Sequence, residues 1–123
     1  MAARPRSILV GYDGSEAAQR ALGAAADLVG YGSRLTVAMV KGGDRLEDVS
    51  RSARELLHRR QVTARYVEPV GEPAEQLIET AAEIGADLVV VGRRSRSAIQ
   101  RLVLGSVSAD VVRGADCDVL VVR

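Results

Sequence analysis

The stretch that most constrains the fold is residues 87–110, where an apolar run precedes a basic loop and a second apolar segment. Residues 87–92 read Asp-Leu-Val-Val-Val-Gly. A short run of β-branched residues stopped by glycine is typical of a strand buried on both faces. Gly105 and Ser106 stand just before residues 107–113, whose apolar positions can form one helix face. Ser106 is predicted to be the N-cap, because its hydroxyl can accept a hydrogen bond from a free N–H group of the first turn.

The loop between these segments carries only basic charge, on Arg93, Arg94, Arg96 and Arg101. A strand, a basic loop of small residues and a helix N-terminus together favour an anion, because free N–H groups and the helix dipole both attract negative charge. The residues alone leave two interpretations open. The loop is either an anion-binding loop or an ordinary connection with solvated arginines.

The rest of the chain alternates segments of strand and helix character. Short apolar or alternating runs predict strands, and apolar residues at helical spacing separate them. The predicted strands other than 87–92 are residues 7–11, 34–40, 62–68 and 118–122. This alternation with short connections predicts a parallel sheet covered by helices on both faces, in one domain spanning residues 1–123.

Local signals predict where the helices begin and end. Asp13 and Ser15 are alternative caps for the first helix, and Asp44 is predicted to cap the second. Pro73 suits the first position of the third helix, and Gly85 is predicted to end it.

Composition argues against several classes of partner. The 17 basic and 16 acidic residues nearly cancel, so the whole molecule does not attract nucleic acid or anionic membrane. Three tyrosines are the only aromatic residues, which disfavours a base-stacking surface. No apolar run approaches the roughly 20 residues that span a bilayer. We therefore expect a cytoplasmic protein without nucleic acid or membrane partners.

No familiar catalytic constellation is present in the sequence. There is no Walker loop with its lysine, no Ser-Gly-Gly pyrophosphatase loop, no zinc cluster and no nucleophile–base pair. Lys41 has no motif around it, and His58 is predicted to be a surface residue. Cys117 lies between Asp116 and Asp118, which disfavour a thiolate, and is predicted to be structural.

The spacing of Gly92, Ser95 and Gly105-Ser106 resembles the nucleotide loop of universal stress proteins, Gly-x2-Gly-x9-Gly-[Ser/Thr], with Ser95 in place of the second glycine. The resemblance extends along the chain in Ile-Leu-Val-Gly-Tyr-Asp-Gly-Ser at 8–15, Gly-Glu-Pro at 71–73 and Val-Leu-Val-Val at 119–122. It implies an α/β fold with a five-stranded parallel sheet of order 3-2-1-4-5 and helices on both faces, the Rossmann-like adenine-nucleotide alpha-hydrolase-like fold.

The resemblance also implies that ATP, with or without Mg²⁺, binds where the loops after the first and fourth strands meet. Asp13 would contact the ribose and Val40 the adenine. A serine at position 95 would cost on the order of 1–2 kcal/mol, about tenfold in affinity, if that position requires a left-handed backbone. The residues implied to contact the nucleotide are Gly11, Tyr12, Asp13, Val40, Gly92, Arg94, Ser95, Gly105, Ser106, Val107 and Ser108.

The function implied is that of an ATP-binding regulator of the stress response, which acts by binding and dimerisation and has at most slow ATP hydrolysis. The alternative is a protein-interaction module of the same fold that binds no nucleotide. A homodimer is implied through the last strand, with its residues Val119, Leu120, Val121 and Val122 paired antiparallel across a two-fold axis. The order 3-2-1-4-5 places that strand at a sheet edge, where its unpaired N–H and C=O groups need a partner.

Overall fold

A computed structural model describes residues 5–39, 45–93 and 106–123 of the chain. Strands and helices alternate throughout, as the sequence predicts. They are β1 (Ser7–Tyr12), α1 (Glu16–Leu28), β2 (Arg34–Met39), α2 (Leu46–Arg59), β3 (Arg65–Val67), α3 (Pro73–Ile84), β4 (Leu88–Gly92), α4 (Ser106–Gly114) and β5 (Asp118–Val122). Within the described ranges, no helix combines the length and apolar character needed to cross a membrane.

The five strands form one sheet of order β3-β2-β1-β4-β5, in which every neighbouring pair is parallel. This order confirms the prediction. β1 lies at the centre, and its Val10 pairs with Val37 of β2 on one side and with Val90 of β4 on the other. All three valines are fully buried, as expected for central strands of a parallel sheet.

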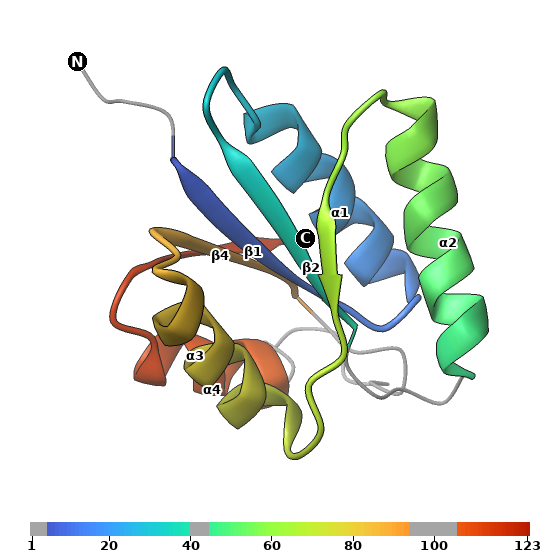
Figure 1. Cartoon of the computed structure of the whole chain (residues 1–123). Coiled ribbons are helices and arrows are strands. Elements are labelled where there is room, and N and C mark those ends of the chain that lie inside the picture. Colours follow the sequence, from blue (N-terminus) through green and yellow to red (C-terminus); the bar gives the residue numbers. More distant parts are fainter. Residues whose placement is uncertain (1–4, 40–44, 94–105) are drawn as a thin grey trace.

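Helices cover both faces of the sheet. α1 and α2 lie on one face, and α3 and α4 lie together on the other (Figure 1). Because side chains alternate along a strand, Ile8, Val10 and Tyr12 of β1 point into the core beneath α1 and α2, whereas Leu9 packs under α3 with Leu77. The sheet is thus held between two separate apolar layers.

Two of the predicted helix caps are confirmed, and a third lies elsewhere. The Ser15 hydroxyl accepts a hydrogen bond from the Ala18 N–H at 3.1 Å, which makes Ser15 the N-cap of α1. Pro73 begins α3, and Gly85 ends it in the left-handed conformation with φ 66°. The N-cap of α2 is Arg45, without a side-chain bond, one position after the predicted Asp44, which lies outside the described residues.

The third strand is shorter than predicted. Residues 62–68 were expected to be extended, but only Arg65–Val67 pairs with β2. The chain is still completing the turn after α2 at this point, because the N–H of Val62 donates to the Leu57 carbonyl and Gln61 has φ 59°. The alternating pattern alone could not reveal this, since it persists through residues that the preceding helix terminus holds.

Candidate functional site

The sheet reverses its winding between β1 and β4. The chain leaves β1 into α1 on one face, and it leaves β4 into α4 on the opposite face, although β1 and β4 are neighbours. Such a topological switch point is where open parallel sheets bind ligands, beyond the carboxyl ends of the strands. β1 and β4 pair with each other, so the carboxyl ends of both strands, followed by residues 12–15 and by Arg93, lie at the same edge of the sheet.

Asp13 sits in a tight turn between β1 and α1. Its Oδ1 accepts a hydrogen bond from the Ser15 N–H at 2.9 Å, and Gly14 between them has φ 86°. The side chain is half-buried, and Oδ2 makes no hydrogen bond with any described residue. The turn therefore fixes the carboxylate through one oxygen and leaves the other available to a hydroxyl or N–H donor.

Gly92 ends β4 against the first turn of α1. A Cβ placed on Gly92 would lie 2.8 Å from both the carbonyl carbon and the oxygen of Ala17, which are backbone atoms. A Cβ on Gly11 would lie 2.8 Å from Leu77 Cδ1, the end of a side chain on α3. Both glycines thus allow helices to approach the ends of the central strands closely. Sequence reasoning assigned them to nucleotide contact, and it missed this packing requirement.

Tyr12 is part of the core as well as of the predicted site. Its side chain is fully buried between β1 and the α1–α2 layer, and its hydroxyl is hydrogen-bonded to the Ser52 hydroxyl of α2. Burial raises the pKa of the phenol, and the Asp13 carboxylate raises that pKa further, against the lowering effect of the Ser52 bond. Ser52 was missed, although the alternation along β1 points Tyr12 toward the helix layer that contains it.

Ser108 joins the start of α4 to the end of β4. It is 2% exposed, and its hydroxyl donates to the Arg93 carbonyl oxygen at 3.1 Å. Arg93 in turn donates its N–H to the Val122 carbonyl at 2.7 Å. These bonds hold the two ends of the predicted nucleotide loop at fixed positions beside β5.

Several predicted site residues lie outside the described part of the chain. They are Val40, Arg94, Ser95 and Gly105. Ser106, predicted to cap the last helix, is the first residue of α4. Val107 is half-buried against the apolar layer beneath α3 and α4.

His58 and Cys117 are the two other titratable residues that the sequence analysis considers. His58 is exposed on α2, as predicted. Burial raises the pKa of the Cys117 thiol, and the carboxylates of Asp118, Asp87 and Asp116 raise it further, so the thiol form is favoured. In the ranges that the structure describes, no three acidic, histidine or cysteine side chains gather as a metal site would require.

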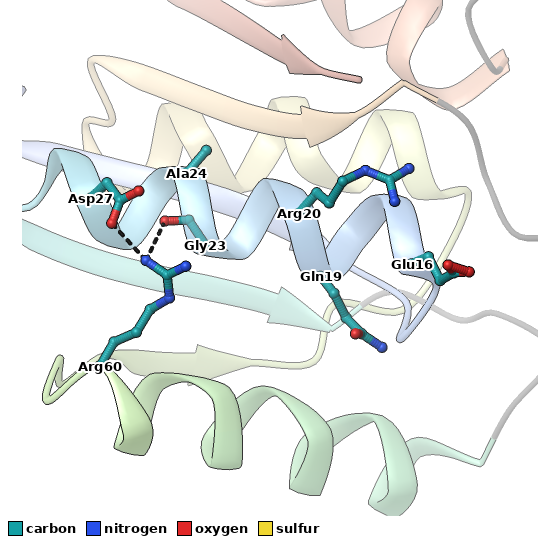
Figure 2. A pocket seen from close by; sticks show the side chains of 7 residues that line it. All are labelled: Glu16, Gln19, Arg20, Gly23, Ala24, Asp27 and Arg60. Carbon is teal, nitrogen blue, oxygen red and sulfur yellow. Dashed lines mark hydrogen bonds and ion pairs between the residues drawn. The ribbon is translucent and has the colours of Figure 1, made fainter.

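A hollow of about 470 Å³ lies on the outer side of α1, next to the end of α2 (Figure 2). Arg60 reaches across it, and its Nη1 donates to Asp27 Oδ1 at 2.6 Å and to the Gly23 carbonyl at 3.3 Å. A Cβ on Gly23 would lie 3.0 Å from the Arg60 guanidinium. The lining contains both acidic residues, Glu16 and Asp27, and two arginines. The contacts of Arg60 with Gly23 and Asp27 join the end of α2 to α1, so we interpret the hollow as part of the packing between these two helices.

Comparison with known proteins places the chain in a family. The family model described as the universal stress protein family matches residues 38–123. The chain belongs to the universal stress protein family. Universal stress protein Rv1636 of Mycobacterium tuberculosis is 34% identical over 140 aligned positions, which cover 96% of each chain. A universal stress protein of Thermus aquaticus is 34% identical over 137 positions, covering 96% of this chain and 98% of the relative.

Solved universal stress protein structures share the Rossmann-like fold of this chain. The crystal structure of Rv1636 superposes with a TM-score of 0.71 at 33% identity, covering 100% of this chain and 98% of that protein. A universal stress protein crystallised in complex with cAMP superposes with a TM-score of 0.78 at 29% identity, covering 98% and 99%. An adenine nucleotide is therefore a ligand of a protein that is similar to this one over its whole length.

Proposed function

We propose that this universal stress protein binds an adenine nucleotide, with ATP as the first candidate, at the switch point between β1 and β4. It acts in the cytoplasm as a single-domain regulator of the stress response, through binding and dimerisation and not through fast turnover. The alternative is an interaction module of the same fold without a nucleotide.

The observation that carries this proposal is the position of the Asp13 turn. Asp13 follows β1 at the switch point, and one of its carboxylate oxygens is held by the Ser15 N–H while the other makes no bond with described residues. A fixed carboxylate with a free oxygen is suited to accept hydrogen bonds from the two hydroxyls of a ribose.

The opposite side of the switch point suits the phosphates. α4 begins there, and a helix N-terminus favours an anion through its free N–H groups and its dipole. The Ser108 hydroxyl and the Arg93 N–H fix the ends of the loop that connects β4 to α4. The sugar would thus lie over the end of β1 and the phosphates toward α4. The complex of a similar protein with cAMP supports the choice of an adenine nucleotide as the ligand.

Isothermal titration calorimetry with ATP, AMP and cAMP tests this assignment. Asp13→Asn is the most informative variant, because an amide oxygen can still accept from the Ser15 N–H and keep the turn while the charge is lost. We expect micromolar binding in the wild type and at least a tenfold loss in Asp13→Asn. Asp116→Asn is the matched control, because Asp116 is exposed and lies beyond the amino end of β5.

Each outcome decides between the two functions. Binding that is lost in Asp13→Asn and kept in Asp116→Asn supports the nucleotide site at the switch point. Equal binding in both variants would mean that the nucleotide binds away from Asp13, and this result overturns the assignment. No heat with the wild type at millimolar concentrations of all three nucleotides supports the interaction module.

We propose that the chain forms a homodimer through β5. β5 lies at the edge of the sheet, and one side of its backbone has no strand partner within the described residues. Leu120 on this strand is 37% exposed, which is high for a large apolar residue next to an open edge. Antiparallel pairing with a second copy would satisfy the edge and cover Leu120.

Size-exclusion chromatography with light scattering tests the dimer. The wild type should elute at micromolar concentration with twice the chain mass of 13.0 kDa. Leu120→Lys should shift the protein toward the monomer, because a buried lysine at the pairing edge is unfavourable. Val70→Lys is the control, since Val70 is 87% exposed and lies between β3 and α3. A wild-type monomer, or a dimer that Leu120→Lys leaves intact, contradicts the proposed interface.

A further inference from the structure

A second basic site lies at the amino end of the sheet, opposite to the switch point. It is a groove of about 620 Å³ on the face of the sheet that α3 and α4 share. Its lining includes Ser7, Arg34, Thr36, Thr63, Arg65 and Ile84.

The groove exists because α3 covers only part of this face. Ala38 and Val67, near the carboxyl ends of β2 and β3, pack into the apolar layer under α3. Thr36 and Arg65 precede them by two residues on the same face, and they are paired with each other in the sheet. At the amino half of β2 and β3 the sheet therefore presents hydroxyls and arginines where the other half presents apolar side chains.

Two positively charged residues, Arg34 and Arg65, line this groove. Arg34 and Thr36 are two positions apart on β2, and Arg65 is the neighbour of Thr36 on β3, so the two arginines occupy diagonal positions on one face. Long side chains at such positions reach each other, and like charges there repel. Neither guanidinium forms an ion pair or donates a hydrogen bond to any residue that the structure describes.

The nearby negative groups are already bound. The Asp87 carboxylate accepts hydrogen bonds from the backbone N–H groups of Arg6 and Ser7. At the end of α3, two of the last carbonyls accept from the N–H groups of Gly85 and Ala86. The groove itself contains no acidic side chain.

We propose that this groove binds the phosphate group of a small phosphorylated ligand between Arg34 and Arg65. Two guanidiniums can hold a phosphate through charge-assisted hydrogen bonds. A bound phosphate would also remove the repulsion between the two arginines. The site is independent of the nucleotide site, because it lies at the other end of the strands.

Amide NMR spectra during a titration with inorganic phosphate test this site at constant ionic strength, with chloride as the matched salt. We expect saturable shifts of the amides of Thr36 and Arg65 and of the side-chain N–H groups of both arginines, with millimolar half-saturation. The double variant Arg34→Gln/Arg65→Gln should weaken the binding by roughly tenfold or more. Arg59→Gln on α2 is the control for the loss of a positive charge outside the groove.

The position of the shifts separates this site from the nucleotide site. Shifts confined to the amides of Asp13, Gly14 and Ser15 would place phosphate at the switch point alone and overturn the proposal. Shifts at Thr36 that remain linear, or that persist unchanged in the double variant, would also overturn it. Retained dispersion of the amide spectrum shows that a variant is folded, so a loss of binding cannot be mistaken for unfolding.

Discussion

Replacing Gly92 by alanine is the most direct test of how the switch point is built. The new Cβ would lie 2.8 Å from two backbone atoms of Ala17, whereas ordinary contact begins at 3.4 Å. β4 and α1 must therefore move apart by about half an ångström or more, because a backbone cannot rotate away as a side chain can. Overpacking of this kind costs about 1–3 kcal/mol, and a backbone obstacle places Gly92→Ala in the upper half of that range.

A smaller effect acts in the opposite direction. Gly92 is not among the glycines with positive φ, so alanine is not strained there and gains about 0.4–1 kcal/mol from the less flexible unfolded chain. The net loss of unfolding free energy is then about 1–2.5 kcal/mol. Urea denaturation followed by circular dichroism should show the midpoint falling by roughly 1 M with an unchanged slope.

Two other glycines serve as comparisons for Gly92. Gly11→Ala meets only the end of the Leu77 side chain, so the loss should be smaller, about 1 kcal/mol. In Gly32→Ala the new Cβ meets nothing within 4 Å, so the only loss of unfolding free energy comes from the backbone strain of alanine at a φ of 85°, about 1 kcal/mol. If Gly92→Ala stays within about 0.5 kcal/mol of the wild type and loses only nucleotide affinity, Gly92 is a ligand-contact glycine and the packing argument is refuted.

Two further predictions concern hydrogen bonds at opposite ends of β1. Tyr12→Phe removes the bond to Ser52 and should lower the free energy of unfolding by about 1 kcal/mol, measured by urea denaturation; a loss below about 0.3 kcal/mol would contradict a structural role for that bond. Asp87→Ala removes the acceptor for the Arg6 and Ser7 N–H groups and should cost about 1 kcal/mol at pH 7. The hydrogen bond from the Arg6 N–H is the largest of the effects that lower the pKa of Asp87 in the folded protein. The stability difference between the wild type and Asp87→Ala should therefore be complete above pH of about 4, and it should vanish as the pH falls through the folded-state pKa. A difference that does not depend on pH would refute the assignment.

The sequence predicts the fold better than it predicts the ends of the elements. Ser15, Pro73 and Gly85 act as predicted because each of these signals depends on the local backbone alone. The strand expected over residues 62–68 is reduced to Arg65–Val67 at the edge of the sheet. This error arises where tertiary contacts, and not the local sequence pattern, decide how far a strand extends.

The sequence predicts the site residues from their positions in the chain, without the contacts that their side chains make in the fold. The prediction therefore missed the structural roles of several of these residues. Gly92 and Tyr12 lie where a nucleotide contact is expected, yet contacts with Ala17 and Ser52 account for both residues without a ligand. Ser108 is likewise explained by its bond to the Arg93 carbonyl. Among the described candidates, Asp13 is the one whose side chain keeps an oxygen without a hydrogen bond to a described residue. A comparison of Asp13→Asn with the wild type therefore tests the ligand, whereas substitutions at the other three positions would first disturb the scaffold that holds the site.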